Sequence, residues 1–266
     1  MPRLPFSCPQ PWQVAGVAAA LAVWWSTALA IGEARLPTPV QQVHALLEVV
    51  TFSQILASQP GSPGHIWWDL VYTTSRCLSG VFVGSLLAIL FGLAMAWSRT
   101  FRDVTELPIE TLRTIPPLAA IPFFLMWLGP AALTQFLLLV FFAFLRVVIN
   151  TVEAVRNVPP VYGQYAMTMG ATRAAMFRTV VWPAVLPELI GAIRVVLAAS
   201  WGLQVVAELL GTPAGVGKIF SYLVPLLRPD LIIAVIFWIT AIAVVVDQFL
   251  FLPLARRATR WVPRSE

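Results

Sequence analysis

The sequence predicts an all-α protein that crosses a membrane several times. Of its 266 residues, 59% are hydrophobic and only 11% are charged, whereas a soluble domain carries about 25% charged residues. A water-soluble core could not bury so many apolar side chains, so lipid must solvate much of the surface. Long uncharged runs recur along the chain, and the basic residues lie mainly in the segments between them. Basic residues in such segments set membrane orientation, so the net charge of +5 does not indicate nucleic-acid binding.

Six crossings are predicted from these apolar runs. In chain order the predicted spans are 12–31, 77–97, 114–128, 132–149, 188–210 and 231–251, with a cytoplasmic loop over 152–187 and a single transmembrane domain over 1–266. Span 12–31 exceeds the apolar core of a signal peptide and has no A-x-A cleavage site after a charged start, so we expect a retained first helix. The uncharged run from Thr114 to Leu145 is too long for one crossing, and Gly129-Pro130 favours two short ones.

The arginines predict that both termini are cytoplasmic. Two basic groups flank the run from Thr114 to Leu145, and both can be cytoplasmic only if an even number of crossings separates them. The outer side then has three basic residues, Arg35, Lys218 and Arg228. The cytoplasmic side has eleven: Arg3, Arg99, Arg102, Arg113, Arg156, Arg173, Arg178, Arg256, Arg257, Arg260 and Arg264.

Small residues form a stripe along the second predicted span. Gly80, Gly84, Ala88 and Gly92 recur every fourth residue. Helices in lipid associate through close packing, which small residues permit. We therefore expect this helix in the interior of the bundle.

Before that span, Leu36-Pro-Thr-Pro39 is expected to break the chain. A short amphipathic helix should follow at the outer membrane interface. Its expected apolar residues are Val43, Leu46, Leu47 and Val50.

The cytoplasmic loop predicts two helices joined by a sharp bend. Gly170 can adopt the left-handed conformation that ends a helix, and a second helix should begin near Thr172. Pro183 and Pro187 are then expected to end this second helix before the fifth span.

This loop resembles the EAA signature of permeases of binding-protein-dependent ABC importers, E-A-A-x-x-x-G followed ten residues later by I-x-L-P. The matching positions are Ala166, Gly170, Val180 and Pro183. Three positions depart from the signature: Gln164 replaces Glu, Tyr165 replaces the first Ala, and Trp182 replaces Leu.

Further segments are similar to the nitrate, sulfonate, taurine and bicarbonate branch of that family, from about residue 36 to residue 261. They are Leu36–Pro39, Ser75-Arg76 with Gly80 and Gly84, Leu112–Ala119, Ile121-Pro122, Trp127–Gly129, Ile149–Thr151, Ala207-Glu208, Gly215–Gly217, Asp247 and Trp261. Arg146 stands where a proline is usual in that branch.

The resemblance implies a type I ABC importer permease in the bacterial inner membrane, with no cofactor and no metal. The implied partners are two ATPase subunits, a second copy of the permease and an extracytoplasmic binding protein. ATP hydrolysis would belong to the separate ATPase, so this chain would not itself be an enzyme. Residues 160–172 would form a coupling helix that docks on the ATPase, with these candidate coupling residues: Gln164, Ala166, Gly170, Arg173, Phe177 and Pro183.

The implied cargo is a small anionic solute that the sequence does not name. The candidate pathway residues are Arg76, Ser200, Trp201, Gln204 and Glu208. For the charged residues in or beside spans, pairing between helices is the alternative to contact with the cargo. These residues are Glu188, Arg194, Glu208 and Asp247.

Two other classes of protein are alternatives. An ion-coupled secondary transporter predicts inverted repeats, and the two halves show no convincing similarity in hydropathy. An intramembrane enzyme needs paired acids, a Ser–His pair or a metal cluster at one depth, whereas the few ionisable residues are scattered along the spans. Gly215–Lys218 does not satisfy the phosphate-loop pattern, because Thr212 and Ile219 replace the required glycine and hydroxyl residue. Cys8 and Cys77 fit no metal-site spacing.

Overall fold

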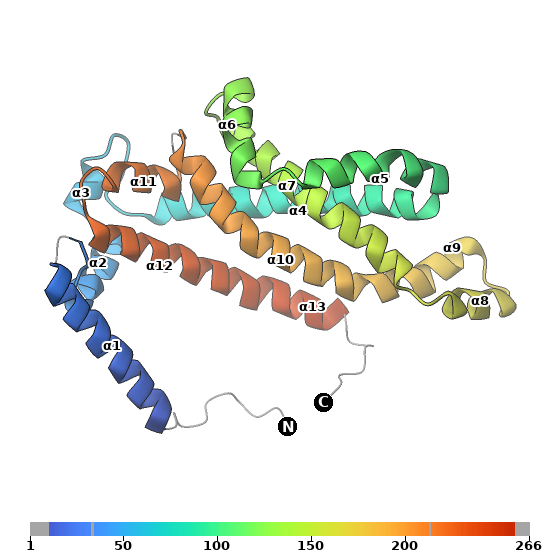
Figure 1. The fold of residues 1–266 in the computed structure, drawn as a ribbon, viewed down its shortest axis with the longest axis horizontal. Helices are drawn as coiled ribbons and strands as arrows, with labels where there is room; N and C mark the ends of the chain where they lie inside the picture. Colours follow the sequence, from blue (N-terminus) through green and yellow to red (C-terminus); the bar gives the residue numbers. More distant parts are fainter. Residues whose placement is uncertain (1–10, 33–34, 213, 259–266) are drawn as a thin grey trace. The chain divides into compact units, whose positions relative to one another are not determined.

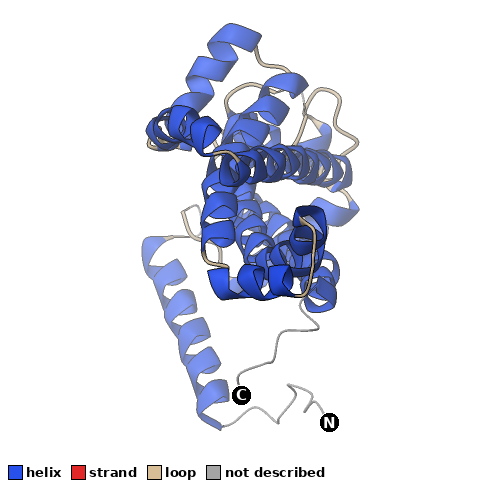
Figure 2. Ribbon diagram, turned by 90° about the vertical axis from the view of Figure 1, so that its right-hand side faces the viewer, coloured by secondary structure: helices blue, strands red, loops and turns tan. Residues whose placement is uncertain are grey.

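The structure is a computed structural model that describes residues 11–32, 35–212 and 214–258. Within these ranges it consists of α-helices, two π-helices and connecting loops, with no strand (Figures 1 and 2). The chain forms two compact units, which are residues 1–67 with 219–239 and residues 68–218 with 240–266. Several residues used above lie outside the described ranges: Arg3, Cys8, Arg260, Trp261 and Arg264.

The first unit contains α1 (Pro11–Ile31), α2 (Pro39–Thr51) and α3 (Gln54–Ala57), with parts of α11 (Val216–Leu223) and α12 (Pro229–Val246). The expected break before α2 is confirmed. Thr38 and Gln41 form a capping box, in which the Gln41 Oε1 accepts from the Thr38 N–H at 2.9 Å. Such reciprocal bonds satisfy backbone donors that the first helical turn leaves free.

One face of α2 packs against the protein, while its apolar residues named above are partly or largely exposed. Gln42, Ala45 and Val49 are buried, whereas Val43 and Leu47 are 57% and 58% exposed. An interfacial amphipathic helix turns such exposed apolar side chains toward lipid, and this placement stays a prediction. Two carbonyls of the helix also accept hydrogen bonds from distant tryptophans. The Trp238 indole donates to the Leu46 carbonyl at 3.0 Å, and the Trp67 indole donates to the Val50 carbonyl at 3.0 Å.

The second unit contains α4 (Trp67–Trp97), except for its first residue, and α5 (Arg99–Arg113), α6 (Pro117–Leu128) and α7 (Ala132–Arg156). The predicted stripe on α4 packs against α7. A Cβ added at Gly80 would lie 2.6 Å from the Leu139 Cβ, and one at Gly84 would lie 2.6 Å from the Val140 carbonyl oxygen. The close packing expected of this stripe is therefore confirmed, while the opposite face of α4 exposes apolar side chains such as Phe82 and Leu90.

α5 and α6 form a bent pair with an angle of 96°. Pro116 is the N-cap of α6 and Pro117 its first residue, so the chain must leave the α5 helix before them. α6 has 12 residues, and its length of about 18 Å is less than the roughly 30 Å of a bilayer's hydrocarbon core. Gly129, at φ 74°, then separates α6 from α7, as the Gly-Pro pair predicted.

The rest of the second unit follows α8 (Pro160–Thr168), α9 (Arg173–Met176) and the π-helix η1 (Phe177–Val181) into α10 (Trp182–Leu209). Part of α12, the π-helix η2 (Asp247–Phe251) and α13 (Leu252–Ala258) complete it. Figure 1 shows α9 and α10 as successive parts of one long element.

The prediction that Pro183 and Pro187 end a helix is wrong. Residues Arg173–Leu209 form one helix of 37 residues. The π-turn of η1 ends at Val181, and Pro183 follows in the first turn of α10, where its missing N–H does little harm. Pro187 lies inside α10, a position that membrane helices tolerate.

Among the described residues, four helices are long and apolar enough to cross a membrane: Trp67–Trp97, Ala132–Arg156, Arg173–Leu209 and Pro229–Arg257. The α5–α6 pair passes the same test jointly, and Ala15–Ile31 is a shorter apolar helix. The chain is therefore an all-helical, multi-pass membrane protein. Six crossings and cytoplasmic termini remain predictions.

Candidate functional site

The loop predicted to contact an ATPase contains a sharply defined elbow after α8. The Gly170 N–H donates to the Met167 carbonyl at 2.9 Å, and the Ala171 N–H donates to the Ala166 carbonyl at 3.0 Å. These two bonds form a Schellman motif, which requires a left-handed residue after the helix. Gly170 provides it at φ 81°, so the predicted helix end is confirmed.

The second side of the elbow begins at a capped helix. The Thr172 hydroxyl accepts a hydrogen bond from the Ala175 N–H at 3.2 Å, which satisfies a free donor of the first turn of α9. The predicted start near Thr172 is confirmed. Two helices thus meet across residues 169–172. Local hydrogen bonds end the first helix and begin the second.

The surface of α8 and the residue after it is rich in exposed apolar side chains. None of its residues is buried, and Tyr165 and Met169 at the elbow are 70% and 76% exposed. The candidates Gln164 and Arg173 are also exposed, while Ala166 is half-buried. Exposed aromatic and methionine side chains on a short helix are suited to contact with a partner.

Two of the predicted coupling residues lie at the base of the elbow instead. Phe177 packs edge-on against Trp97, with ring centroids 6.0 Å apart, and also contacts Trp182. Pro183 is in the first turn of α10. The base is anchored by the buried side chains of Ala154, Val185 and Leu189. These contacts tie the elbow to α4 and α7.

A buried polar cluster lies near the other end of α10. Glu208, which is 1% exposed, accepts hydrogen bonds from the Gln204 amide at 2.7 Å and from the Gly217 N–H at 3.0 Å. The Thr73 hydroxyl also donates to its carboxylate. A buried carboxylate is costly unless such donors surround it. The arrangement therefore indicates that Glu208 holds together α4, α10 and the glycine-rich segment 215–217, where α11 begins.

The glycine-rich turn is shaped by this carboxylate. A Cβ added at Gly215 would lie 2.5 Å from the Glu208 carboxylate, and its φ of 112° also disfavours other residues. The Gly215 N–H donates to Asp69 at 2.8 Å, and the Val216 N–H donates to the Thr73 hydroxyl at 3.0 Å. These donors serve the protein's own acceptors, so the turn has a structural reason for its glycines.

Arg76 joins the edge of the same cluster. Its guanidinium lies 3.9 Å from the centre of the Tyr72 ring and donates to the Gln135 amide oxygen at 3.4 Å. Gln204 donates to the same oxygen at 3.3 Å. Three of the five candidate pathway residues, Arg76, Gln204 and Glu208, are thus brought together.

The other two candidates are placed elsewhere in α10. The buried Ser200 hydroxyl donates to the Val196 carbonyl one turn earlier, and Trp201 is buried in the core. Sequence reasoning missed Asp69, Thr73 and Gln135, which supply partners to the cluster. Gln135 could have been predicted as a functional candidate, because it is a polar residue within an apolar run.

A second polar link joins α10 to η2. Arg194 binds both carboxylate oxygens of Asp247, the first residue of η2. Glu188 accepts a hydrogen bond from the Asn157 amide at 3.1 Å. Pairing between helices, one of the two interpretations of these charged residues, is therefore what the structure shows.

Comparison with known proteins identifies related sequences. Residues 80–258 match the family model described as "Binding-protein-dependent transport system inner membrane component". The chain is 30% identical over 261 residues to the taurine transport system permease protein TauC of Escherichia coli, covering 97% of this chain and 92% of TauC. It is 28% identical over 226 residues to the putative aliphatic sulfonates transport permease protein SsuC of Bacillus subtilis, covering 85% and 78% respectively.

A solved structure supports the fold. A chain of the MetNI methionine ABC transporter, in an inward-facing conformation, aligns with a TM-score of 0.58 at 20% identity. The alignment covers 73% of this chain and 98% of that one. At this level of identity the likeness establishes the architecture alone.

Proposed function

This chain belongs to the family of binding-protein-dependent transport system inner membrane components, and on that premise we propose that it is the membrane-spanning subunit of an ATP-driven importer. Its solute is a small anion of the nitrate, sulfonate, taurine or bicarbonate type. The names of two relatives, TauC and SsuC, refer to compounds that carry a sulfonate group. ATP hydrolysis belongs to separate ATPase subunits.

The elbow between α8 and α9 is the observation that carries this proposal. It presents exposed apolar side chains, such as Met167 and Met169, on a helix whose end is held by two hydrogen bonds. Methionine adapts to the shape of a groove, and the exposed Arg173 can pair with an acidic residue of a partner. The elbow is therefore a suitable docking element for an ATPase.

Continuity of the helix gives the elbow a mechanical role. One helix runs from Arg173 to Leu209 and includes Glu208 of the buried polar cluster. A rigid element of this kind transmits a rigid-body movement from one end to the other. We assign Glu208 and Gln204 to holding the outer end of that lever, and Arg76, whose guanidinium is half-buried, to contact with the solute.

We further propose how the subunits of the importer assemble. Two ATPase subunits bind the elbows of two permease copies, and an extracytoplasmic binding protein delivers the solute in the bacterial inner membrane. The two copies surround a central pathway.

Reconstitution tests the proposed function. The chain would be co-expressed with the ATPase encoded nearest to its gene and placed in proteoliposomes with the corresponding binding protein. We expect uptake of labelled taurine or nitrate that requires ATP and is abolished by a hydrolysis-deficient ATPase. Uptake driven by a sodium or proton gradient without ATP would instead establish a secondary transporter.

A further inference from the structure

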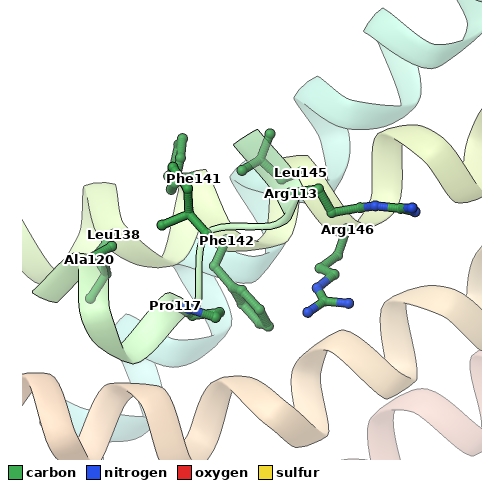
Figure 3. Close-up of a pocket in the computed structure, with 9 residues that line it drawn as sticks. Arg113, Pro117, Ala120, Leu138, Phe141, Phe142, Leu145 and Arg146 are labelled. Atoms are coloured by element: carbon green, nitrogen blue, oxygen red, sulfur yellow. The ribbon is translucent and has the colours of Figure 1, made fainter. Parts of the chain in front are cut away.

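A hollow beside the bend between α5 and α6 is lined by apolar side chains and two arginines. Apolar residues of α6 and α7 form most of its wall, including Phe141 and Phe142. Two arginines from different elements also line it: Arg113 ends α5, and Arg146 lies within α7. Figure 3 shows both arginines at one end of the hollow, with Ala120 and Leu138 at the other.

Arg146 is an unusual residue for its position. It lies between the buried residues Leu145 and Val147, in a helix apolar enough to cross a membrane. Charged residues in such helices almost always pair or face a water-filled cavity, because an isolated charge in lipid is costly. The contact seen for Arg146 is with the Phe142 ring, whose centre is 5.8 Å from the guanidinium carbon.

Neither arginine has an anionic partner within the described part of the chain. The ion pairs found there use other arginines: Arg102, Arg156, Arg194 and Arg228. Arginine keeps its positive charge under ordinary conditions. Two cations on one hollow raise its electrostatic cost further, unless an anion occupies the space between or beside them.

We propose that this hollow is a binding site for a small oxyanion, and that the occupant is the sulfonate or nitrate group of the transported solute. The positions of Arg113 and Arg146 support the binding of an oxyanion, whereas the identity of that anion rests on the proposed function. A guanidinium group binds an oxyanion through two parallel N–H bonds. The aromatic wall at Phe141 and Phe142 suits the carbon chain of an organic sulfonate.

Both arginines are exposed, and their backbones lie in constrained segments. Arg113 immediately precedes the bend that Pro116 and Pro117 impose, and the conformations before each proline are restricted. The backbone of Arg146 belongs to a helix whose residues on either side are buried. A constrained backbone lowers the part of the entropy cost that would come from ordering the chain when an anion binds.

The depth of Arg146 in the membrane indicates which part of the pathway the site would occupy. Arg146 is 14 residues after Ala132, the first residue of α7 (146 − 132 = 14), which corresponds to roughly 21 Å along the helix. In the predicted orientation, this places Arg146 in the cytoplasmic half of a bilayer about 30 Å thick. The site would hold the anion on the inner part of its route.

A binding measurement on the full chain tests the site without requiring transport. The chain would be placed in nanodiscs of phosphatidylcholine, and trifluoromethanesulfonate would be titrated while its ¹⁹F NMR line width is recorded. We expect saturable broadening for the wild type. Arg146→Gln and Arg113→Gln should each weaken the apparent affinity roughly tenfold or more, since each removes a charge-assisted contact. Arg146→Lys should retain more affinity than Arg146→Gln.

Arg99→Gln is the matched control, because it removes an equal charge from an exposed position that does not line the hollow. Binding should be unchanged in this variant. Absence of broadening in the wild type, or equal broadening in all variants, would overturn the proposal. Size-exclusion profiles identify any variant that misfolds, and the two independent glutamine variants keep the test decisive.

An anionic lipid headgroup offers the same phosphate-like chemistry, so a second arm separates the two sources. The titration would be repeated with phosphatidylglycerol, and native mass spectrometry would follow lipid retained by the wild type and Arg146→Gln. Unchanged probe binding supports the solute site. Loss of probe binding, with phosphatidylglycerol held only by the wild type, would overturn it in favour of a lipid site. Neither result depends on ATP, so failure here leaves the importer proposal standing.

Discussion

The hydroxyl oxygen of Thr73 lies 2.8 and 2.9 Å from the two carboxylate oxygens of Glu208, although 135 residues separate them in the chain. The same carboxylate accepts the Gly217 N–H, and the Thr73 hydroxyl in turn accepts the Val216 N–H. This closed set of bonds joins α4, α10 and the glycine-rich turn. It fixes one end of the helix whose other end is the proposed docking elbow.

Glu208→Gln should destabilise the protein. The carboxylate accepts from three donors, whereas the amide would direct its own N–H₂ group toward one of them. A buried donor left without an acceptor costs about 1–3 kcal/mol. A lower midpoint of thermal unfolding in detergent is the expected result, measured by size-exclusion chromatography after heating.

Glu110→Gln provides the control for that substitution, because Glu110 is exposed on α5. Its unfolding midpoint should stay close to the wild-type value. Equal midpoints for the two variants would show that the Glu208 hydrogen bonds contribute little.

Gly84→Leu should disrupt assembly of α4 on α7. Even a Cβ at this position would lie 2.6 Å from the Val140 carbonyl oxygen and 2.8 Å from the Ala143 Cβ. Backbone atoms of a packed helix cannot move aside cheaply, so the two helices must separate. The expected result is a strongly reduced yield of folded protein and loss of transport.

Gly202→Ala is the comparison, since an added Cβ there meets nothing within 4 Å. It should be tolerated, because alanine is a better helix former than glycine by roughly 1 kcal/mol. A folded yield of Gly84→Leu equal to that of the wild type would mean that α4 does not pack on α7 through this stripe.

Gly170→Asp should leave the protein in the membrane but weaken its association with the ATPase. The residue at φ 81° sits at the elbow, where an added charge would be buried in the contact or displace the bend. Gly170→Ala should be milder, because it adds strain without charge. Co-purification of the ATPase and solute-stimulated ATP hydrolysis measure the effect.

Gly170→Asn distinguishes charge from shape at the elbow. Asparagine matches aspartate in size and also tolerates left-handed conformations. It should preserve most of the association that aspartate removes. If Gly170→Asp retains both co-purification and stimulated hydrolysis at wild-type levels, the elbow is not the coupling element.

Cysteine labelling in intact cells tests the predicted orientation. Met169→Cys places an exposed thiol beside Gly170 without changing its backbone, and Ser62→Cys reports on the loop after α3. With Cys8 replaced by serine, a membrane-impermeant maleimide should label Ser62→Cys only. Labelling of Met169→Cys would place the elbow outside and reverse the proposed topology.

Features that depend on a few neighbouring residues were predictable. The helix end at Gly170, the cap at Thr172 and the break at Gly129-Pro130 all arise from local hydrogen bonds or backbone restrictions. The stripe that includes Gly84 was predictable because its spacing repeats with the helical period. These patterns needed no knowledge of which helices become neighbours.

Other features were predicted wrongly or not at all, because they depend on which residues become neighbours in the folded protein. Pro183 was expected to end a helix, but it lies in the first turn of α10, directly after a π-helical segment and one tryptophan. The indoles of Trp67 and Trp238 reach the carbonyls of α2 from distant segments, which the sequence did not reveal. Arg146 was seen only as a departure from the related branch.

Composition and local spacing thus determine by themselves that the chain is helical, resides in a membrane and contains a bent loop, because hydrophobicity and helix caps act over one or two turns. Only the tertiary structure brings Thr73 to Glu208, or Arg113 and Arg146 to one hollow. The physical reason is that a polar side chain acquires its partners from helices distant in sequence. Their register and crossing geometry are set by the packing of the whole unit, which no short segment specifies.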